Sequence, residues 1–209
     1  MPESIERLIF DFRTENREFA PHLVEGSERT VTGYAIVFNQ ESRVLVDKAS
    51  RKSFVEKIEP RAVSVDFLNA QDIKLNFNHD NGRLLARSLF GSGTLKFEID
   101  DYGVRFEAEL PNTTDGNDVL ELIRRGDVWG CSFAFQYAKD GVTDEKRGGR
   151  NIRTVCKFAA IHDFAIVVDP AYWGTMVVSS RSFDVQDEPA TQARMLAADE
   201  EFMLSLENI

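Results

Sequence analysis

Cysteine and histidine are scarce in this sequence. Its 209 residues include only two cysteines, Cys131 and Cys156, and three histidines. Two cysteines cannot build the disulfide framework of a small secreted domain, and they are too few for a cysteine-based zinc site. We therefore expect a protein of a reducing, cytoplasmic-type compartment that uses no metal and no other cofactor.

Long apolar runs are missing as well. No segment approaches the roughly 18 to 20 apolar residues that cross a membrane, and residues 1–7 lack the basic start and apolar core of a secretory signal. We expect neither membrane contact nor secretion. The sequence also has no glycine-rich phosphate loop and no dinucleotide-binding fingerprint.

The third feature that the sequence lacks is a basic stripe. Its net charge is −10, whereas proteins that bind nucleic acid directly present rows of Lys and Arg to the phosphates. The composition therefore argues against direct nucleic-acid binding. The one basic cluster, residues 146–150, is short and contains two glycines, and we expect it to form the solvated tip of a hairpin.

What is present is the composition of a soluble globular protein, with 43% hydrophobic and 29% charged residues. The length favours one domain, which we place at residues 1–182. Residues 183–189 are expected to be a linker, and residues 190–209 repeat apolar side chains at helical spacing. This last helix either docks on the domain or forms a tail that binds a partner or is cut away.

Local patterns predict several elements of the domain. Runs of β-branched and aromatic residues predict a strand at 30–38 and a hairpin at 93–110. Thr114 or Asp115 is expected to cap a helix that ends before Gly126, because glycine suits the position after a helix.

Two further elements are expected between residues 53 and 83. Ser53 predicts the start of a short helix at 54–58, which Pro60 stops. Alternating apolar and polar residues predict a strand at 73–79, with a turn at 80–83. In this strand His79 would continue the row of inward-facing apolar side chains.

The segment from Trp129 to Phe135 alternates bulky apolar residues with small or polar ones, which is typical of a strand with one apolar face. On its other face Ser132 lies between Gly130 and Ala134, two residues too small to cover a hydroxyl. By itself this pattern favours a strand that packs closely against another backbone. The alternative is a serine that an extended substrate can reach.

A nucleophilic serine needs an imidazole to take its proton and an acceptor to hold that imidazole. Ser132, His79 and either Asp163 or His162 could supply these roles from three separate strands. Alternation puts Asp163 on one face of its strand together with Ile161, and His162 on the opposite face. Only one of the two should point toward the site, and the period does not tell which.

Two other residues are weaker candidates. Cys131 is a rival nucleophile, but it shares its face with Phe133 and Phe135 and is expected to be a small buried hydrophobe. His22 lies in a polar N-terminal segment, where we expect it to be exposed.

Short segments in a fixed order resemble one known family. They lie at residues 33–38, 54–60, 78–80, 85–87, 93–95, 110–111, 125–135 and 163–172, and the series ends near Arg181. In order and spacing they resemble the prohead maturation proteases of tailed bacteriophages, which are serine peptidases related to the herpesvirus assemblins.

The resemblance places the family's histidine on His79 and its nucleophile on Ser132. A glutamate that precedes the Pro-Ala-Tyr turn in the relatives falls on Asp163, whose side chain is one methylene shorter. Because the assemblins use a second histidine, His162 is the alternative third member. With Ser132 as nucleophile, its neighbours Gly130 and Ala134 would form the floor for an extended substrate.

Arg87, in the matching segment 85–87, is a candidate for positioning the substrate, with a salt bridge to a carboxylate as the alternative. The resemblance also implies an α+β fold, a small mixed and mostly antiparallel β-barrel surrounded by a few helices. Residues 1–182 would form the protease domain. Residues 183–209 would be a tail that is removed by self-cleavage or contacts the scaffold.

The implied function is a serine endopeptidase enclosed in the immature capsid, or prohead, in the host cytoplasm. Its partners would be the major capsid protein, a scaffold or the N-terminal extension of the capsid protein, the portal, and a second copy in a homodimer. Two alternatives stay open. One is a non-enzymatic scaffold or assembly factor on the same fold, and the other is a cysteine peptidase that uses Cys131.

Overall fold

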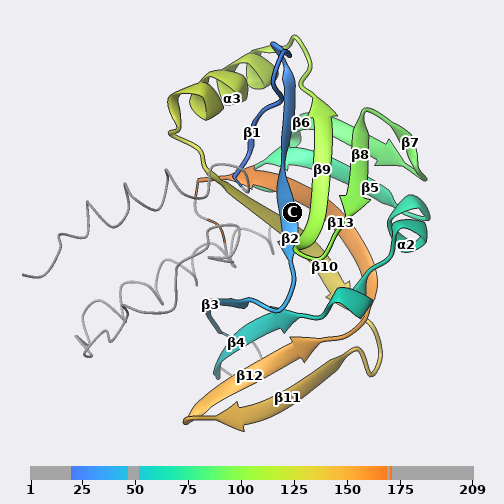
Figure 1. Ribbon diagram of the computed structural model, residues 1–209, viewed down its shortest axis with the longest axis vertical. Helices are drawn as coiled ribbons and strands as arrows, with labels where there is room; N and C mark the ends of the chain where they lie inside the picture. The colour runs from blue at the N-terminus through green and yellow to red at the C-terminus, as the bar shows by residue number, and fades with distance from the viewer. Residues whose placement is uncertain (1–19, 47–51, 169, 171–209) are drawn as a thin grey trace, which may run out of the picture.

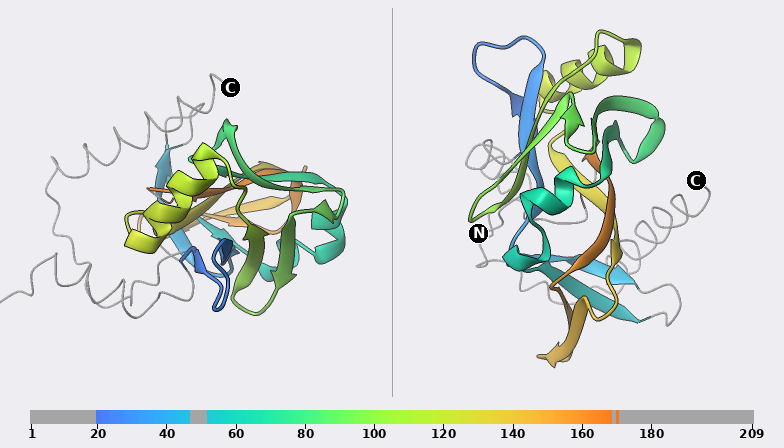
Figure 2. Two further views of the ribbon diagram at one scale, coloured as in Figure 1. Left: turned by 90° about the horizontal axis from the view of Figure 1, so that it is seen from above. Right: turned by 90° about the vertical axis from the view of Figure 1, so that its right-hand side faces the viewer.

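Strands dominate the computed structural model, which describes residues 20–46, 52–168 and 170 (Figure 1). Within these residues the strands form three sheets, and the few helices are short or lie at the edge of the molecule. Helix α3 lies at one end of the long axis and the β11–β12 hairpin at the other (Figures 1 and 2). No helix of the described part is long and apolar enough to cross a membrane.

The first sheet is antiparallel throughout and has four strands in the order β1-β2-β9-β8. Its strands are β1 (His22–Leu23), β2 (Thr30–Val37), β8 (Leu95–Ile99) and β9 (Gly103–Glu109). The strand predicted at 30–38 and the hairpin predicted at 93–110 are therefore confirmed. Both were marked by β-branched and aromatic residues, which pack well on a pleated, half-buried surface.

A second four-stranded sheet has the order β11-β12-β4-β3, and its β12–β4 pair is parallel. Its strands are β3 (Glu41–Val46), β4 (Ser53–Ile58), β11 (Val142–Arg147) and β12 (Arg150–Val155). The basic cluster does form the tip of the β11–β12 hairpin. The helix predicted at 54–58 is wrong, because that segment is β4, which pairs with a strand on each side.

The third sheet has five strands in the order β10-β13-β5-β6-β7, with one parallel pair, β13 and β5. Its strands are β5 (Asp72–Phe77), β6 (Asp80–Leu89), β7 (Ser92–Gly93), β10 (Gly130–Tyr137) and β13 (Phe158–Val167). In Figure 1 the orange strand β13 runs as a long arc across the middle of the molecule. The turn predicted at 80–83 is wrong, because these residues begin β6.

The helices are η1, a 3-10 turn at Pro60–Ala62, α2 (Val65–Asn69) and α3 (Thr114–Arg125). Helix α3 starts one residue earlier than predicted, since Thr113 caps it by accepting a hydrogen bond from the N–H of Gly116 at 3.2 Å. Gly126 follows it with φ 75°, the left-handed conformation that ends helices and favours glycine, as predicted.

One hydrophobic cluster joins the three sheets and α3. Its members include Phe106, Leu95, Phe164, Leu75, Ile58 and Val119. The predicted α+β class, with mixed and mostly antiparallel strands and few helices, is confirmed. The closed barrel is wrong for the described residues, because β10 ends its sheet and lies against β2 without pairing with it.

The predicted division at residue 182 stays a prediction. The linker and terminal helix predicted at 183–209 lie outside the described residues. Residues 1–19 lie outside them as well.

Candidate active site

Ser132 lies in β10, the edge strand of the five-stranded sheet. The strand alternates as predicted: Cys131, Phe133 and Phe135 face the core, where the two phenylalanine rings stack with centroids 4.9 Å apart. Ser132 points to the opposite face and is 4% exposed. The aromatic anchors fix the strand, and so they fix the position of the serine.

Strand β13 brings an acidic residue next to this serine. In the antiparallel register Ser132 lies opposite Ala165, and Ala134 lies opposite Asp163. Residues opposite each other in a ladder point to the same face of a sheet. Asp163 therefore shares the face of Ser132, two residue pairs further along the strands.

A β-bulge at His162 separates the two candidates for the third role. The register changes from Ala134 opposite Asp163 to Phe135 opposite Ile161, so His162 is the extra residue of β13 and is exposed. Ile161 is consequently buried on the core face. The prediction that Ile161 and Asp163 share one face is wrong, because simple alternation does not anticipate the bulge.

His79 is presented by a tight turn between β5 and β6. Phe77 and Asp80 pair across this turn, and its two central residues, Asn78 and His79, have φ values of 53° and 58°. Positive φ at both central residues is the geometry of a two-residue hairpin, and Asn and His tolerate it better than most side chains.

Asn78 fastens this turn to β13. Its backbone N–H donates to the carbonyl of Ile166 at 3.0 Å, and its side-chain Oδ1 accepts from the N–H of Val168 at 3.1 Å. Asn78 was not predicted as a site residue. The sequence did contain a signal: asparagine tolerates the left-handed backbone of a tight turn, and Asn78 directly precedes His79.

The turn changes the direction of the histidine. We predicted that His79 continues the row of Ile73, Leu75 and Phe77, which do face the core. That prediction is wrong, since the strand ends at Phe77 and the side chain of His79 bends back over the opposite face of the sheet to reach Asp163.

His79 and Asp163 form a buried pair. Nδ1 of His79 lies 2.7 Å from Oδ1 of Asp163, and the two side chains are 3% and 10% exposed. A carboxylate only accepts hydrogen bonds, so it favours the tautomer with a proton on Nδ1. The other ring nitrogen, Nε2, then carries the free electron pair that a general base needs.

The three proposed substrate-binding residues have different surroundings. Gly130 is buried against Pro170: a Cβ atom at this position would lie 2.7 Å from both Cδ and Cγ of the proline ring. Ala134 is half-buried. Arg87 donates two hydrogen bonds to Asp72. Its Nε lies 2.6 Å from Oδ1, and its Nη2 lies 2.5 Å from Oδ2. Arg87 in β6 lies opposite Lys74 in β5, which in turn lies opposite Asp163 in β13, so Arg87 is two strands away from Asp163.

Cys131 does not have the surroundings of a nucleophile. It is 1% exposed on the apolar face of β10, and burial raises the pKa of its thiol above the usual range. A thiolate is the reactive form of cysteine, and this environment disfavours it. His22, for its part, lies in β1 of another sheet, with Nδ1 2.8 Å from the carbonyl oxygen of Ala20.

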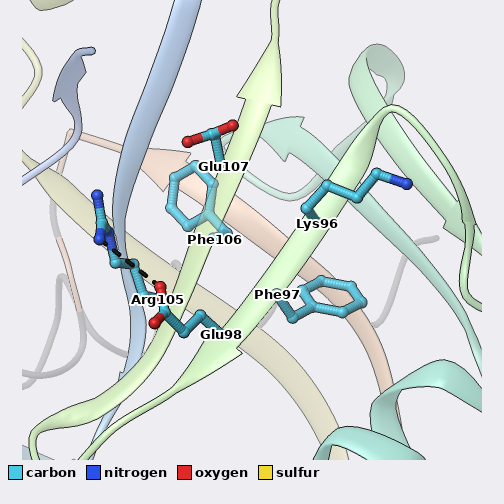
Figure 3. Close-up of a pocket in the computed structure, with 6 residues that line it drawn as sticks. All are labelled: Lys96, Phe97, Glu98, Arg105, Phe106 and Glu107. Carbon is cyan, nitrogen blue, oxygen red and sulfur yellow. Dashed lines mark ion pairs between the residues drawn. The ribbon is translucent and has the colours of Figure 1, made fainter. Parts of the chain in front are cut away.

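The hollow shown in Figure 3 lies elsewhere. It has a volume of about 360 Å³ and is lined by residues of β8 and β9, namely Lys96, Phe97, Glu98, Arg105, Phe106 and Glu107. Arg105 pairs with Glu98 at 3.7 Å. None of its residues belongs to the set around Ser132. Among the described residues, no group of three or more His, Cys, Asp or Glu side chains is placed to hold a metal ion.

Comparison with known proteins identifies a family for this chain. Residues 14–189 match the model of the family described as caudovirus prohead serine protease. No curated protein and no solved structure matches the chain. Because the family match covers most of the sequence, the chain belongs to the caudovirus prohead serine proteases.

Proposed function

We propose that this protein is a serine endopeptidase of capsid maturation in which Ser132 is the nucleophile, His79 the general base and Asp163 the residue that orients His79. The observation that carries the proposal is the buried His79–Asp163 hydrogen bond of 2.7 Å on the sheet face that Ser132 also occupies. Burying the carboxylate of Asp163 costs free energy, and its contact with the imidazole of His79 offsets part of that cost.

The proposed reaction is acyl transfer from a peptide bond. Nε2 of His79 takes the proton of the Ser132 hydroxyl as its oxygen attacks the carbonyl carbon. When the tetrahedral intermediate collapses, the carbon–nitrogen bond breaks and the proton passes from Nε2 to the leaving amine. Water then attacks the acyl-enzyme by the same sequence, and Ser132 regains its proton.

Asp163 has a supporting role in this scheme. It holds Nδ1–H of the imidazole and stabilises the imidazolium that forms when His79 takes the proton, without accepting that proton itself. Its burial strengthens this effect, because few water molecules screen the charge. His162, exposed on the bulge, has no part in the proposed reaction.

The proposed substrates are those expected for a prohead protease: a scaffold or the N-terminal extension of the major capsid protein, inside the immature capsid in the host cytoplasm. Enclosure with the substrate gives a high effective concentration, so little affinity is needed. The portal as a further partner and a homodimer as the active state are part of the same proposal.

Self-cleavage of the C-terminal segment is also proposed. Its support is the position of Pro170, which packs on Gly130, two residues before Ser132 in the same strand. Pro170 itself therefore lies near the candidate nucleophile. An intramolecular cut in residues 183–209 would need no encounter with a second molecule.

The test is co-expression of the full chain with the major capsid protein of its own phage, followed by mass spectrometry of both proteins. We expect cut capsid protein with the wild-type chain and none with Ser132→Ala. Ser88→Ala is the matched control, a buried serine on the core face of β6, and it should cleave as the wild type does. Cleavage by Ser132→Ala would overturn the proposal and favour the cysteine-peptidase alternative, whereas uncut capsid protein with the wild-type chain would favour the scaffold alternative.

A further inference from the structure

Asn76 in β5 is buried without a hydrogen-bond partner. Its side chain is 0% exposed, and neither Nδ2 nor Oδ1 is bonded to any group in the part of the chain that the structure describes. Unpaired polar atoms are rare inside proteins because they lose their hydrogen bonds to water on folding. Features that cost stability in this way concentrate at functional sites.

The strand register places Asn76 in the row of the candidate nucleophile. Ala165 of β13 lies opposite both Ser132 of β10 and Asn76 of β5, so the three side chains point to the same face. Asp163 lies opposite Lys74, two residues before Asn76. Neighbouring strands are about 4.8 Å apart, which makes Asn76 a diagonal neighbour of Asp163.

Asn76 is buried among its neighbours in three strands and the turn that follows it. Lys74 lies on the same face of the same strand and is only half-buried, and the neighbouring Ala165 has no more than a methyl group. The turn at Asn78 and His79 follows directly, and from it the histidine side chain bends back over this face to Asp163. On the other side of β5 the register sets Leu84 of β6 opposite Asn76, so Asn76 lies between this leucine, Ala165 and the start of the turn that carries His79.

We infer that Asn76 is a positioning residue for the His79–Asp163 pair, with its amide dipole directed at the charge that develops during the reaction. Its amide, unpaired in the structure, would offer its carbonyl oxygen to the imidazolium that forms when His79 takes the proton of Ser132. A dipole that is fixed before the charge appears needs no reorganisation when the proton moves.

This inference rests on the proposed function and adds to it a residue that no sequence pattern marked. The other charged groups of this face, and Asp80 after the turn, stay in place in the test described next. They are Asp163, Lys74, Asp80 and the Asp72–Arg87 pair.

The test compares Asn76→Leu with the wild type, using the full chain and a fluorophosphonate probe that labels an active serine. Leucine has nearly the shape of asparagine and no polar atom, so the melting temperature should stay the same or rise. We expect the labelling rate to fall about tenfold or more, the size of losing one hydrogen bond to a charged group. Thr154→Val, a buried polar-to-apolar change in β12, is the matched control and should label at the wild-type rate.

The pH profile separates positioning from a structural role. Labelling needs a neutral imidazole, so its rate falls as His79 takes up a proton at low pH. Without the carbonyl of Asn76 the imidazolium is less stable and forms only at lower pH. The acidic midpoint of the profile should therefore move down by about half a pH unit or more.

Each outcome decides between the two roles. A slower Asn76→Leu with a lowered acidic midpoint supports the inference. A stable variant with the wild-type rate and midpoint overturns it, as does a destabilised variant whose folded fraction labels normally. If Asn76→Leu does not fold, Asn76→Ala is measured in the same way. If the wild-type chain itself does not label, the proposed function fails, not this inference alone.

Discussion

Nδ1 of His79 lies 2.7 Å from Oδ1 of Asp163, although 84 residues separate them in the chain. One local irregularity produces this contact. The left-handed turn at Asn78 and His79 bends the histidine back over the sheet, to the face on which the regular β10–β13 register already places Asp163. Regular strands would have placed His79 on the core face, on the side of the sheet opposite Asp163.

Replacing Asp163 by asparagine should abolish most of the activity. The amide can donate a hydrogen bond to Nδ1 and so favours the wrong tautomer, with the proton on Nε2, where the base needs its free electron pair. By analogy with other triads, we expect the rate of serine labelling or peptide cleavage to fall about 10³- to 10⁴-fold. Asp80→Asn, an exposed aspartate beside the same histidine, is the control and should retain activity.

Replacing His162 by alanine should have little effect. The side chain is exposed on the bulge, so its loss removes neither packing nor a catalytic hydrogen bond. We expect activity within about twofold of the wild type and an unchanged melting temperature. Loss of activity in His162→Ala together with an active Asp163→Asn would reverse the assignment of the third role.

Cys131 should be inert in the folded protein. Burial raises the pKa of its thiol, so a thiol reagent at mildly alkaline pH should label the half-buried Cys156 and leave Cys131 unmodified until the protein unfolds. Cys131→Ser should keep its activity per folded molecule but lose about 1–3 kcal/mol of stability, because it buries a hydroxyl among apolar side chains. A folded but inactive Cys131→Ser would favour the cysteine-peptidase alternative.

The Arg87–Asp72 ion pair should contribute little to the free energy of unfolding, and this contribution should disappear at low pH. Both side chains are largely in solvent, where water and salt screen such pairs. The hydrogen bond from Arg87 lowers the pKa of Asp72. The pair therefore stabilises the fold above the unfolded-state pKa of about 3.9, and this contribution disappears as the pH falls through the lowered folded-state value.

A substitution of Arg87 tests its role in substrate binding. Arg87→Met should leave the rate of serine labelling by a small probe within about twofold of the wild type. If Arg87 also positions the capsid substrate, cleavage of that substrate slows while probe labelling does not. Equal effects on both reactions would instead point to a change in the site itself.

The parts of the fold that follow from local patterns could be predicted from the sequence. The strand that carries Ser132 was visible because its aromatic residues alternate with small ones, and helix α3 because Gly126 marks its end and its start was expected within two residues of the observed cap, Thr113. The segment Ser53–Ile58 was assigned to a helix from a capping signal. Its pairing with β3 and β12 involves residues far away in the chain, which a local signal does not report.

The residues of the candidate site could be proposed from the sequence, whereas their geometry could not. His79, Ser132 and Asp163 were singled out from pattern and resemblance, but the face of His79 was wrong because its turn was expected after residue 79. The bulge at His162 leaves no mark in the alternation of β13. Asn76 is one of the polar residues of an alternating strand, and nothing in that pattern indicates that it is buried.

The most direct test of the account is the site at which a fluorophosphonate probe attaches to the purified full chain. The account predicts one covalent adduct on Ser132, identified by peptide mass spectrometry, and no adduct on Ser132→Ala or His79→Ala, both folded as judged by circular dichroism. An adduct on another serine, or equal labelling of Ser132→Ala, would contradict the central claim that Ser132 is the nucleophile.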